Sequence, residues 1–178
     1  GARTNHLIDV LIVGAGPAGN QAADMLSRMG RSVLVLDYRQ RIGDKLCTGI
    51  VSRESAEQYG VPEHLIHRPA KGSWVVPPVG NRLFFQRPDT QAYVIDRARR
   101  RGAEFLLERR VIDLSFTPHG VVAIARNGDR LETYEARAAI VATGFASSVG
   151  RRLGLESPRK AAFAAQVALR GVEVDELH

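Results

Sequence analysis

Three glycines and one aspartate have the spacing of a site for the diphosphate and ribose of a dinucleotide. Gly14, Gly16 and Gly19 directly follow an apolar run at residues 8–13. In such a site the first glycine permits a tight turn from strand to helix, and the second lets the backbone approach the diphosphate. The third lets the helix pack closely on the strand, and the N–H groups at the helix start bind the negative charge.

Asp37 completes the pattern, because it ends a second apolar run, residues 33–36, about 20 residues beyond the glycines. A carboxylate there accepts hydrogen bonds from ribose hydroxyl groups and favours a ribose without a phosphate. Residues 20–29 between the two runs have an amphipathic helical pattern that ends at Gly30. We therefore predict a βαβ dinucleotide-binding unit. The alternative is an ordinary strand, turn and helix with incidental glycines.

Composition narrows the class of protein and its partners. The chain has 178 residues, of which 44% are hydrophobic and 25% charged, as in a globular domain. Its net charge of +6 suits cofactor phosphates or peripheral contact with an anionic membrane surface. Nucleic acid is not expected as a partner, because the sequence has no aromatic-rich single-strand platform and no zinc-ligand spacing. The five histidines also lack the spacing of metal ligands, so we expect no metal.

A single cysteine, Cys47, excludes an internal disulfide and favours a cytoplasmic location, with membrane association left open. No apolar run has the length of a membrane span. The chain starts without methionine or a signal-peptide pattern, so we expect a processed or partial product.

The remaining sequence predicts an α/β fold with two kinds of sheet. Ser52 is expected to cap a short helix that ends near Gly60, after a polar loop at residues 38–52. A small antiparallel sheet is expected at residues 73–76, 82–85 and 92–95, with turns at Pro77-Pro78, Gly80-Asn81 and Pro88-Asp89. The sequence then predicts a strand at 104–107 and a three-stranded meander at 111–116, 121–125 and 131–134. A separate buried strand is expected at 138–142.

On these motifs the chain resembles the geranylgeranyl reductase-like branch of the p-hydroxybenzoate hydroxylase superfamily of FAD-dependent oxidoreductases. The resemblance rests on the glycine-rich loop with Asp37, the pair Asp96-Arg97, the meander and residues 141–150. Its most specific part is the Lys-x-Cys-x-Gly-x-x-Ser pattern of residues 45–52. It implies a Rossmann-like FAD-binding domain at 1–66 and 97–160, and parts of a substrate-domain sheet at 67–96 and 161–178.

The resemblance also implies a function. FAD, with NAD(P)H as a possible electron donor, would reduce carbon–carbon double bonds of an isoprenoid or other apolar substrate, with Cys47 as the catalytic candidate beside the flavin. A buried apolar role is the alternative for Cys47. The implied cofactor-binding residues are Gly14, Gly16, Pro17, Ala18, Gly19, Asp37, Tyr38, Lys45, Cys47, Thr48, Gly49, Arg97, Val111, Thr143 and Gly144. The alternative functions are a flavin monooxygenase or halogenase relative, and a non-catalytic dinucleotide-binding fragment.

Two departures from the family pattern concern completeness. Only four residues lie between Arg97 and Gly102, whereas family members have a helix there and a parallel crossover normally needs about a dozen residues. The chain also stops before the family's Gly-Asp segment, which contacts the ribityl chain and pyrophosphate. We therefore expect roughly half of the whole protein to be absent by domain size, and FAD to bind the present chain more weakly.

Overall fold

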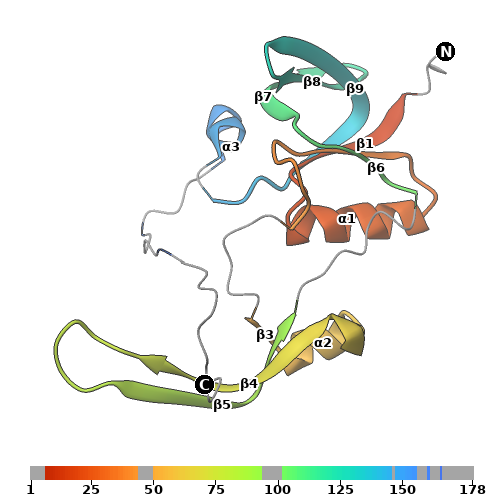
Figure 1. Cartoon of the computed structure of the whole chain (residues 1–178). Helices are drawn as coiled ribbons and strands as arrows, with labels where there is room; N and C mark the ends of the chain where they lie inside the picture. The colour runs from red at the N-terminus through yellow and green to blue at the C-terminus, as the bar shows by residue number, and fades with distance from the viewer. Residues whose placement is uncertain are drawn as a thin grey trace. The chain divides into compact units, whose positions relative to one another are not determined.

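The computed structural model describes residues 7–43, 50–93, 102–145, 147–155, 160 and 165 (Figure 1). The chain divides into two compact units, residues 1–44 with 96–162 and residues 45–95 with 163–178. Residues 45–66, which the sequence-based division gave to the FAD-binding part, lie in the second unit. The short connection between Arg97 and Gly102, where family members have a helix, lies outside the described residues.

Within the described residues, the first unit contains a six-stranded sheet. Its strands, in order across the sheet, are β6 (Glu104–Leu106), β2 (Val33–Leu36), β1 (Ile8–Val13), β9 (Arg130–Val141), β8 (Gly120–Asn127) and β7 (Arg110–Thr117). The first four pair in parallel, and β9, β8 and β7 pair antiparallel. The predicted α/β class, with a Rossmann-like parallel sheet and a three-stranded meander, is confirmed.

The core of this unit lies on both faces of the sheet. Leu11 and Leu34 pack in one hydrophobic cluster, whereas Ile12 and Val35 pack in the other, as the alternation of side chains along a strand requires. Helix α1 (Pro17–Arg28) adds Ala23 to the second cluster. The meander and helix α3 (Ser148–Arg152) add residues to the first. Strands β1 and β2 are thus buried on both faces, which explains the unbroken apolar sequences of residues 10–13 and 33–36.

Strand β9 corrects one prediction. Residues 131–134 and 138–142 were expected to form separate strands, but Arg130–Val141 is one continuous strand of 12 residues. Ala136 pairs with Val121 of β8 on one side and with Ile8 of β1 on the other. No glycine or proline lies between the two predicted segments, so the chain continues from the meander directly into the parallel part of the sheet.

The second unit is a smaller antiparallel sheet with strand order β3-β5-β4, formed by β3 (Ile50–Ser52), β5 (Leu83–Tyr93) and β4 (Ile66–Val75). Helix α2 (Arg53–Gln58) and the 3-10 helix η1 (Glu63–Leu65) lie between β3 and β4. The predicted cap of α2 is confirmed, because Ser55 N donates to Ser52 Oγ at 3.2 Å.

Two predictions for this unit were wrong. Residues 50–52 were expected in a loop, but they pair with residues 90–92 of β5, which satisfies their backbone groups. The expected turn at Pro88-Asp89 lies inside β5, where residues 87–89 face only Lys71 of β4. This irregularity explains the prediction's failure, since proline is tolerated in a sheet where the ladder is interrupted.

Among the described residues, the helices fall short of the length and apolar character that crossing a bilayer requires.

Candidate dinucleotide-binding site

Two glycines of the loop between β1 and α1 are required by the protein's own packing. Gly14 has a φ of +107°, and a Cβ added there would lie 2.5 Å from the Ala142 carbonyl oxygen at the end of β9. A Cβ on Gly19 would lie 1.9 Å from the Gly14 carbonyl oxygen. Both approaches are far inside van der Waals contact with backbone atoms, so the turn and the helix packing each depend on glycine.

Gly16 differs from both. Its φ is −74°, which any residue adopts, and nothing lies within 4 Å of a Cβ built on it. Gly16 is the N-cap of α1, so no side chain caps the start of the helix. The first turn of α1 also contains no acidic residue. The fold therefore leaves open space beside the N-terminal N–H groups of α1, and a diphosphate fits such a cradle.

Asp37 ties the end of β2 to this loop. Its side chain is buried, with 3% of the residue's surface exposed, and its Oδ2 accepts a hydrogen bond from Ala15 N at 2.7 Å. Its Oδ1 accepts from Arg39 N at 2.8 Å, and the Arg39 guanidinium lies 3.3 Å from Oδ2. The carboxylate thus already has protein donors on both oxygens, and it fixes the loop beside the predicted ribose position.

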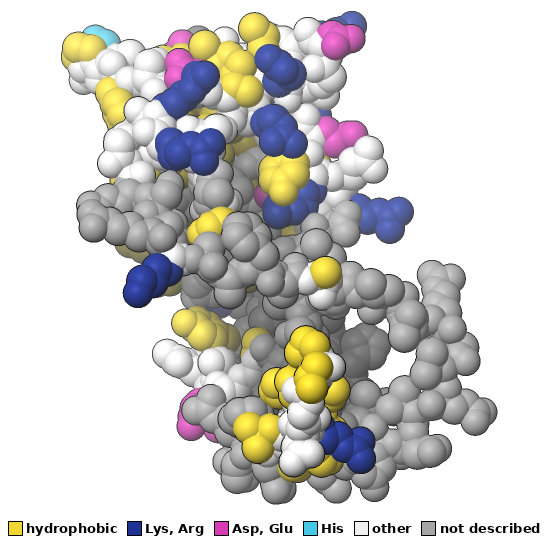
Figure 2. All heavy atoms as spheres, turned by 90° about the vertical axis from the view of Figure 1, so that its left-hand side faces the viewer, with side chains coloured by type: hydrophobic (Ala, Val, Ile, Leu, Met, Phe, Trp, Pro, Cys, Tyr) yellow, Lys and Arg dark blue, Asp and Glu magenta, His cyan; other side chains and the backbone are white. Residues whose placement is uncertain are grey.

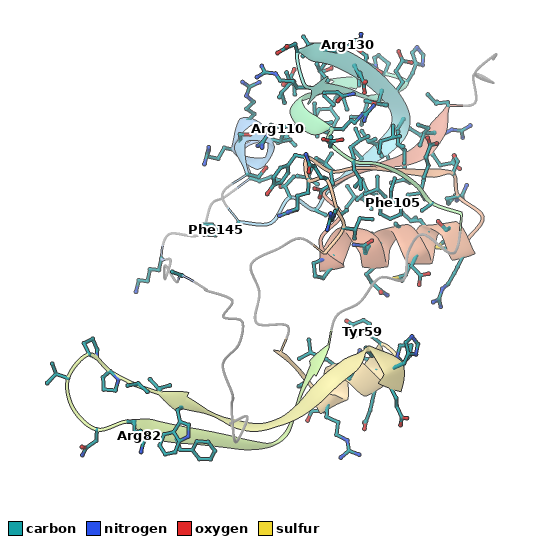
Figure 3. The ribbon with its side chains drawn as sticks, viewed as in Figure 1. Tyr59, Arg82, Phe105, Arg110, Arg130 and Phe145 are labelled. Carbon is teal, nitrogen blue, oxygen red and sulfur yellow. The ribbon has the colours of Figure 1, made fainter. Side chains whose placement is uncertain are left out.

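A cationic surface lies directly beside Asp37. The Tyr38 ring is flanked by two guanidinium groups, those of Arg39 and Arg110, each 4.5 Å from the ring centroid. Arg110 is labelled in Figure 3. We call these three residues the arginine–tyrosine cluster. Guanidinium groups bind phosphates and stack on flat aromatic groups, so this cluster suits the adenosine end of a dinucleotide.

Backbone hydrogen bonds bring Arg110 to this position. Residues 106–109 run alongside residues 37–39, where Asp37 N donates to the Leu106 carbonyl and Arg109 N donates to the Asp37 carbonyl. A third bond joins Glu108 N to the Arg39 carbonyl at 3.0 Å. Glu108 adopts a φ of 60°, a backbone conformation that turns the chain into β7. The start of β7 therefore lies beside the end of β2.

Glu132 holds the side chain of Arg109 in place. Arg109 Nε donates to Glu132 Oε2 at 3.0 Å, Asn127 Nδ2 donates to Oε1 at 3.0 Å, and the Tyr134 hydroxyl donates to Oε2. These donors, with Asn127 first, lower the pKa of Glu132 to about 2. Donors to the charged form of a carboxylate favour that form, so this network is built around an ionised Glu132.

We expect Glu132 to make the chain sensitive to acid. Because the pKa of Glu132 is lower in the folded chain, the unfolded chain takes up its proton first as the pH falls from about 4.5 to about 2. The stability that Glu132 contributes is present above this range and is lost within it. Urea unfolding across this range should show the advantage of wild type over Glu132→Gln shrinking steadily as the pH falls. An advantage that is independent of pH would contradict this account.

The structure brings part of the predicted site together and leaves part undescribed. Gly14, Gly16, Pro17, Ala18, Gly19, Asp37, Tyr38, Thr143 and Gly144 lie at the carboxyl ends of β1, β2 and β9 or at the start of α1. Val111 lies on the edge strand β7, and its side chain packs in the hydrophobic core. Lys45, Cys47, Thr48, Gly49 and Arg97 lie outside the described residues.

The sequence does not predict the arginine–tyrosine cluster beyond Tyr38. The run Arg109-Arg110 is basic, but the sequence does not show which strand it faces. The only local signal was Arg39, two residues after the acidic strand end.

Comparison with known proteins supports the fold and the family. A digeranylgeranylglycerophospholipid reductase of Methanothermobacter thermautotrophicus is 30% identical over 94% of this chain and 48% of the relative. A crystal structure of a geranylgeranyl bacteriochlorophyll reductase-like protein from Thermoplasma acidophilum has a TM-score of 0.69 at 23% identity, covering 85% of this chain and 43% of that one. A complex of aklavinone-11 hydroxylase with FAD and aklavinone has a TM-score of 0.65 at 21% identity, covering 85% and 36%.

The chain spans about half the length of the curated relatives it matches. The predicted resemblance to the geranylgeranyl reductase-like branch is confirmed by these relatives and by the shared fold. A family model described as pyridine nucleotide-disulphide oxidoreductase matches residues 8–170, which is nearly the whole chain. With its glycine-rich loop, buried Asp37 and parallel sheet, the chain belongs to the pyridine nucleotide-disulphide oxidoreductase family.

Proposed function

We propose that this chain is the FAD-binding part of an FAD-dependent oxidoreductase. The observation that carries the proposal is the open space at Gly16, where the fold itself has no need of a glycine. A protein that keeps this position free of a side chain at the start of a helix leaves room for a phosphate group. The family match over residues 8–170 supports the same conclusion.

Each part of the site has a proposed task. The backbone N–H groups of Ala18 and Gly19 bind the diphosphate. Pro17 is the first residue of the helix. Thr143 and Gly144, which follow the end of β9, lie beside the loop. Asp37 fixes the loop beside the ribose of the adenosine, and the arginine–tyrosine cluster binds the adenosine. When bound, FAD supplies hydride transfer, and the protein positions it and excludes competing reactions.

The remaining tasks follow from the family resemblance. We propose that Lys45, Thr48 and Gly49 lie near the flavin, with Cys47 as the catalytic candidate. Arg97 would pair with cofactor phosphate, and the Val111 backbone would contact the adenosine end. These assignments concern the complete site, which the whole protein would provide.

The proposed reaction is reduction of carbon–carbon double bonds in an isoprenoid or other apolar substrate. The relative from Methanothermobacter thermautotrophicus is named as a reductase of a digeranylgeranyl lipid, and this supports the substrate class. NAD(P)H is the proposed electron donor. The test is anaerobic incubation of the whole protein with FAD, NAD(P)H and a geranylgeranylated lipid. Mass spectrometry should show two mass units added for each double bond reduced, since one H₂ is added per bond. Unchanged lipid with fully reduced flavin would exclude the reaction.

A hydroxylase is the second candidate, because aklavinone-11 hydroxylase shares this fold at a TM-score of 0.65. The two functions differ in their need for oxygen. A hydroxylase consumes O₂ in proportion to product and is inactive without it, whereas a double-bond reductase is active under anaerobic conditions. Oxygen uptake measured with an electrode during turnover separates them.

A further inference from the structure

The tip of the β4–β5 hairpin exposes an unusual amount of apolar surface. We define this tip as residues 74–84. Val76 and Val79 are 70% and 90% exposed, and Trp74, Val75 and Leu83 are also exposed. In Figure 2 the tip faces the viewer, and hydrophobic side chains gather there with a basic side chain beside them. A contiguous exposed apolar patch commonly marks an interaction site.

The tip has an ordered base and a short convex loop. The last strand pairs are Trp74 with Phe84 and Val75 with Leu83. The Trp74 and Phe84 rings lie 4.8 Å apart, and the Arg82 guanidinium lies 4.9 Å from the centre of the Trp74 ring (Figure 3). Gly80, with a φ of +109°, completes the turn. The exposed valines therefore project from a braced hairpin.

The charge around the tip has a single sign. Residues 74–84 contain one basic residue, Arg82, and no acidic one. Basic residues next to an apolar segment are attracted to anionic lipid, each contributing about 1 kcal/mol near the surface. Tryptophan and arginine also suit the boundary between water and lipid, because each has an apolar body and a polar end.

We propose that the tip inserts into the surface of a bilayer that contains anionic lipids. The valines and Leu83 would enter the acyl boundary, Trp74 would lie at the headgroup level, and Arg82 would contact lipid phosphate. A convex loop fits a soft surface, whereas a protein partner would need a groove complementary to it. The inference rests on the second unit alone and does not depend on flavin binding.

Trp74 makes the test specific, because it is the only tryptophan of the chain. The 178-residue chain, without FAD, is mixed with vesicles of phosphatidylcholine alone or of phosphatidylcholine with phosphatidylglycerol. We expect the Trp74 emission to shift to shorter wavelength with the anionic vesicles and to be quenched by brominated acyl chains. Binding to the neutral vesicles should be at least about 5-fold weaker, from the loss of lipid attraction for one or more basic residues.

Two variants test the residues, and one serves as a control. Val76→Asp with Val79→Asp should weaken vesicle binding at least about 10-fold, because two apolar side chains are replaced by charges of the sign that anionic lipid repels. Arg82→Gln should weaken it about 5-fold. Both valines are exposed, so the fold should be kept, which far-UV circular dichroism checks. Leu131→Asp makes the same kind of change at a residue of the first unit that is 64% exposed, and it should bind as wild type does.

The proposal fails if wild-type Trp74 emission is unchanged by anionic vesicles, or if the double aspartate variant binds them as wild type does. It also fails if the emission shift occurs without lipid and grows with protein concentration. That result would assign the tip to contact with a second copy of the chain. Since FAD is absent throughout, none of these outcomes bears on the proposed oxidoreductase function.

Discussion

Replacing Gly16 with valine is expected to weaken FAD binding at least about 100-fold, equivalent to about 2.7 kcal/mol, while the chain stays folded. The valine side chain would occupy the space that the diphosphate needs, but it would meet no protein atom within 4 Å of its Cβ. Valine is a poorer N-cap than glycine, so the free energy of unfolding should fall by no more than about 1 kcal/mol. Isothermal titration with FAD and urea unfolding measure the two effects.

Gly19→Ala is the matched variant with the opposite expectation. Its Cβ would lie 1.9 Å from the Gly14 carbonyl oxygen, and a backbone atom cannot rotate away as a side chain can. We expect a loss of about 2–4 kcal/mol in the free energy of unfolding. If Gly16→Val were the more destabilising of the two, or if it bound FAD as wild type does, the open space at Gly16 would not be a phosphate site.

Replacing Asp37 with alanine is expected to lower the free energy of unfolding by about 2–4 kcal/mol. The change removes the acceptor of the Ala15 and Arg39 N–H groups and the partner of the Arg39 guanidinium, in a residue that is 3% exposed. A buried donor left without an acceptor destabilises the fold by its full desolvation penalty. We also expect weaker FAD binding, because Asp37 fixes the glycine-rich loop. Urea unfolding and FAD titration check both effects.

Asp113→Ala is the control for this prediction. Asp113 also pairs with an arginine, since Arg152 lies 3.5 Å away, but its side chain is 45% exposed. Exposed pairs of this kind contribute about 0–1 kcal/mol. Equal destabilisation by Asp37→Ala and Asp113→Ala would mean that the buried hydrogen bonds of Asp37 contribute little.

The β1-α1-β2 unit could be predicted from sequence because its signals are local. The apolar runs at residues 8–13 and 33–36, the three glycines and Asp37 lie within one short stretch, and each fixes its own conformation. Gly14 and Gly19 have the roles in the turn and the helix packing that their spacing predicts. The hydrogen bond from Ala15 N to Asp37 was not predicted, since it depends on how the buried strand end approaches the loop.

The remaining features depend on partners far along the chain. Residues 50–52 form a strand only because β5 pairs with them, and β9 is continuous because β8 and β1 meet on either side of Ala136. Arg110 joins Tyr38 because residues 106–109 hydrogen-bond to residues 37–39. A local pattern predicts that a segment is extended or basic, but tertiary contacts decide what it faces.

The central claim, that the loop between β1 and α1 binds a dinucleotide diphosphate beside Asp37, is tested most directly by NMR. A ¹⁵N-labelled sample of the 178-residue chain is titrated with FAD, which reports even weak binding residue by residue. We expect the largest shifts of backbone amide signals at residues 14–16, 18, 19 and 37–39, since Pro17 has no amide hydrogen. Saturating shifts confined to other residues, or no shifts in these two segments at any FAD concentration, would contradict it.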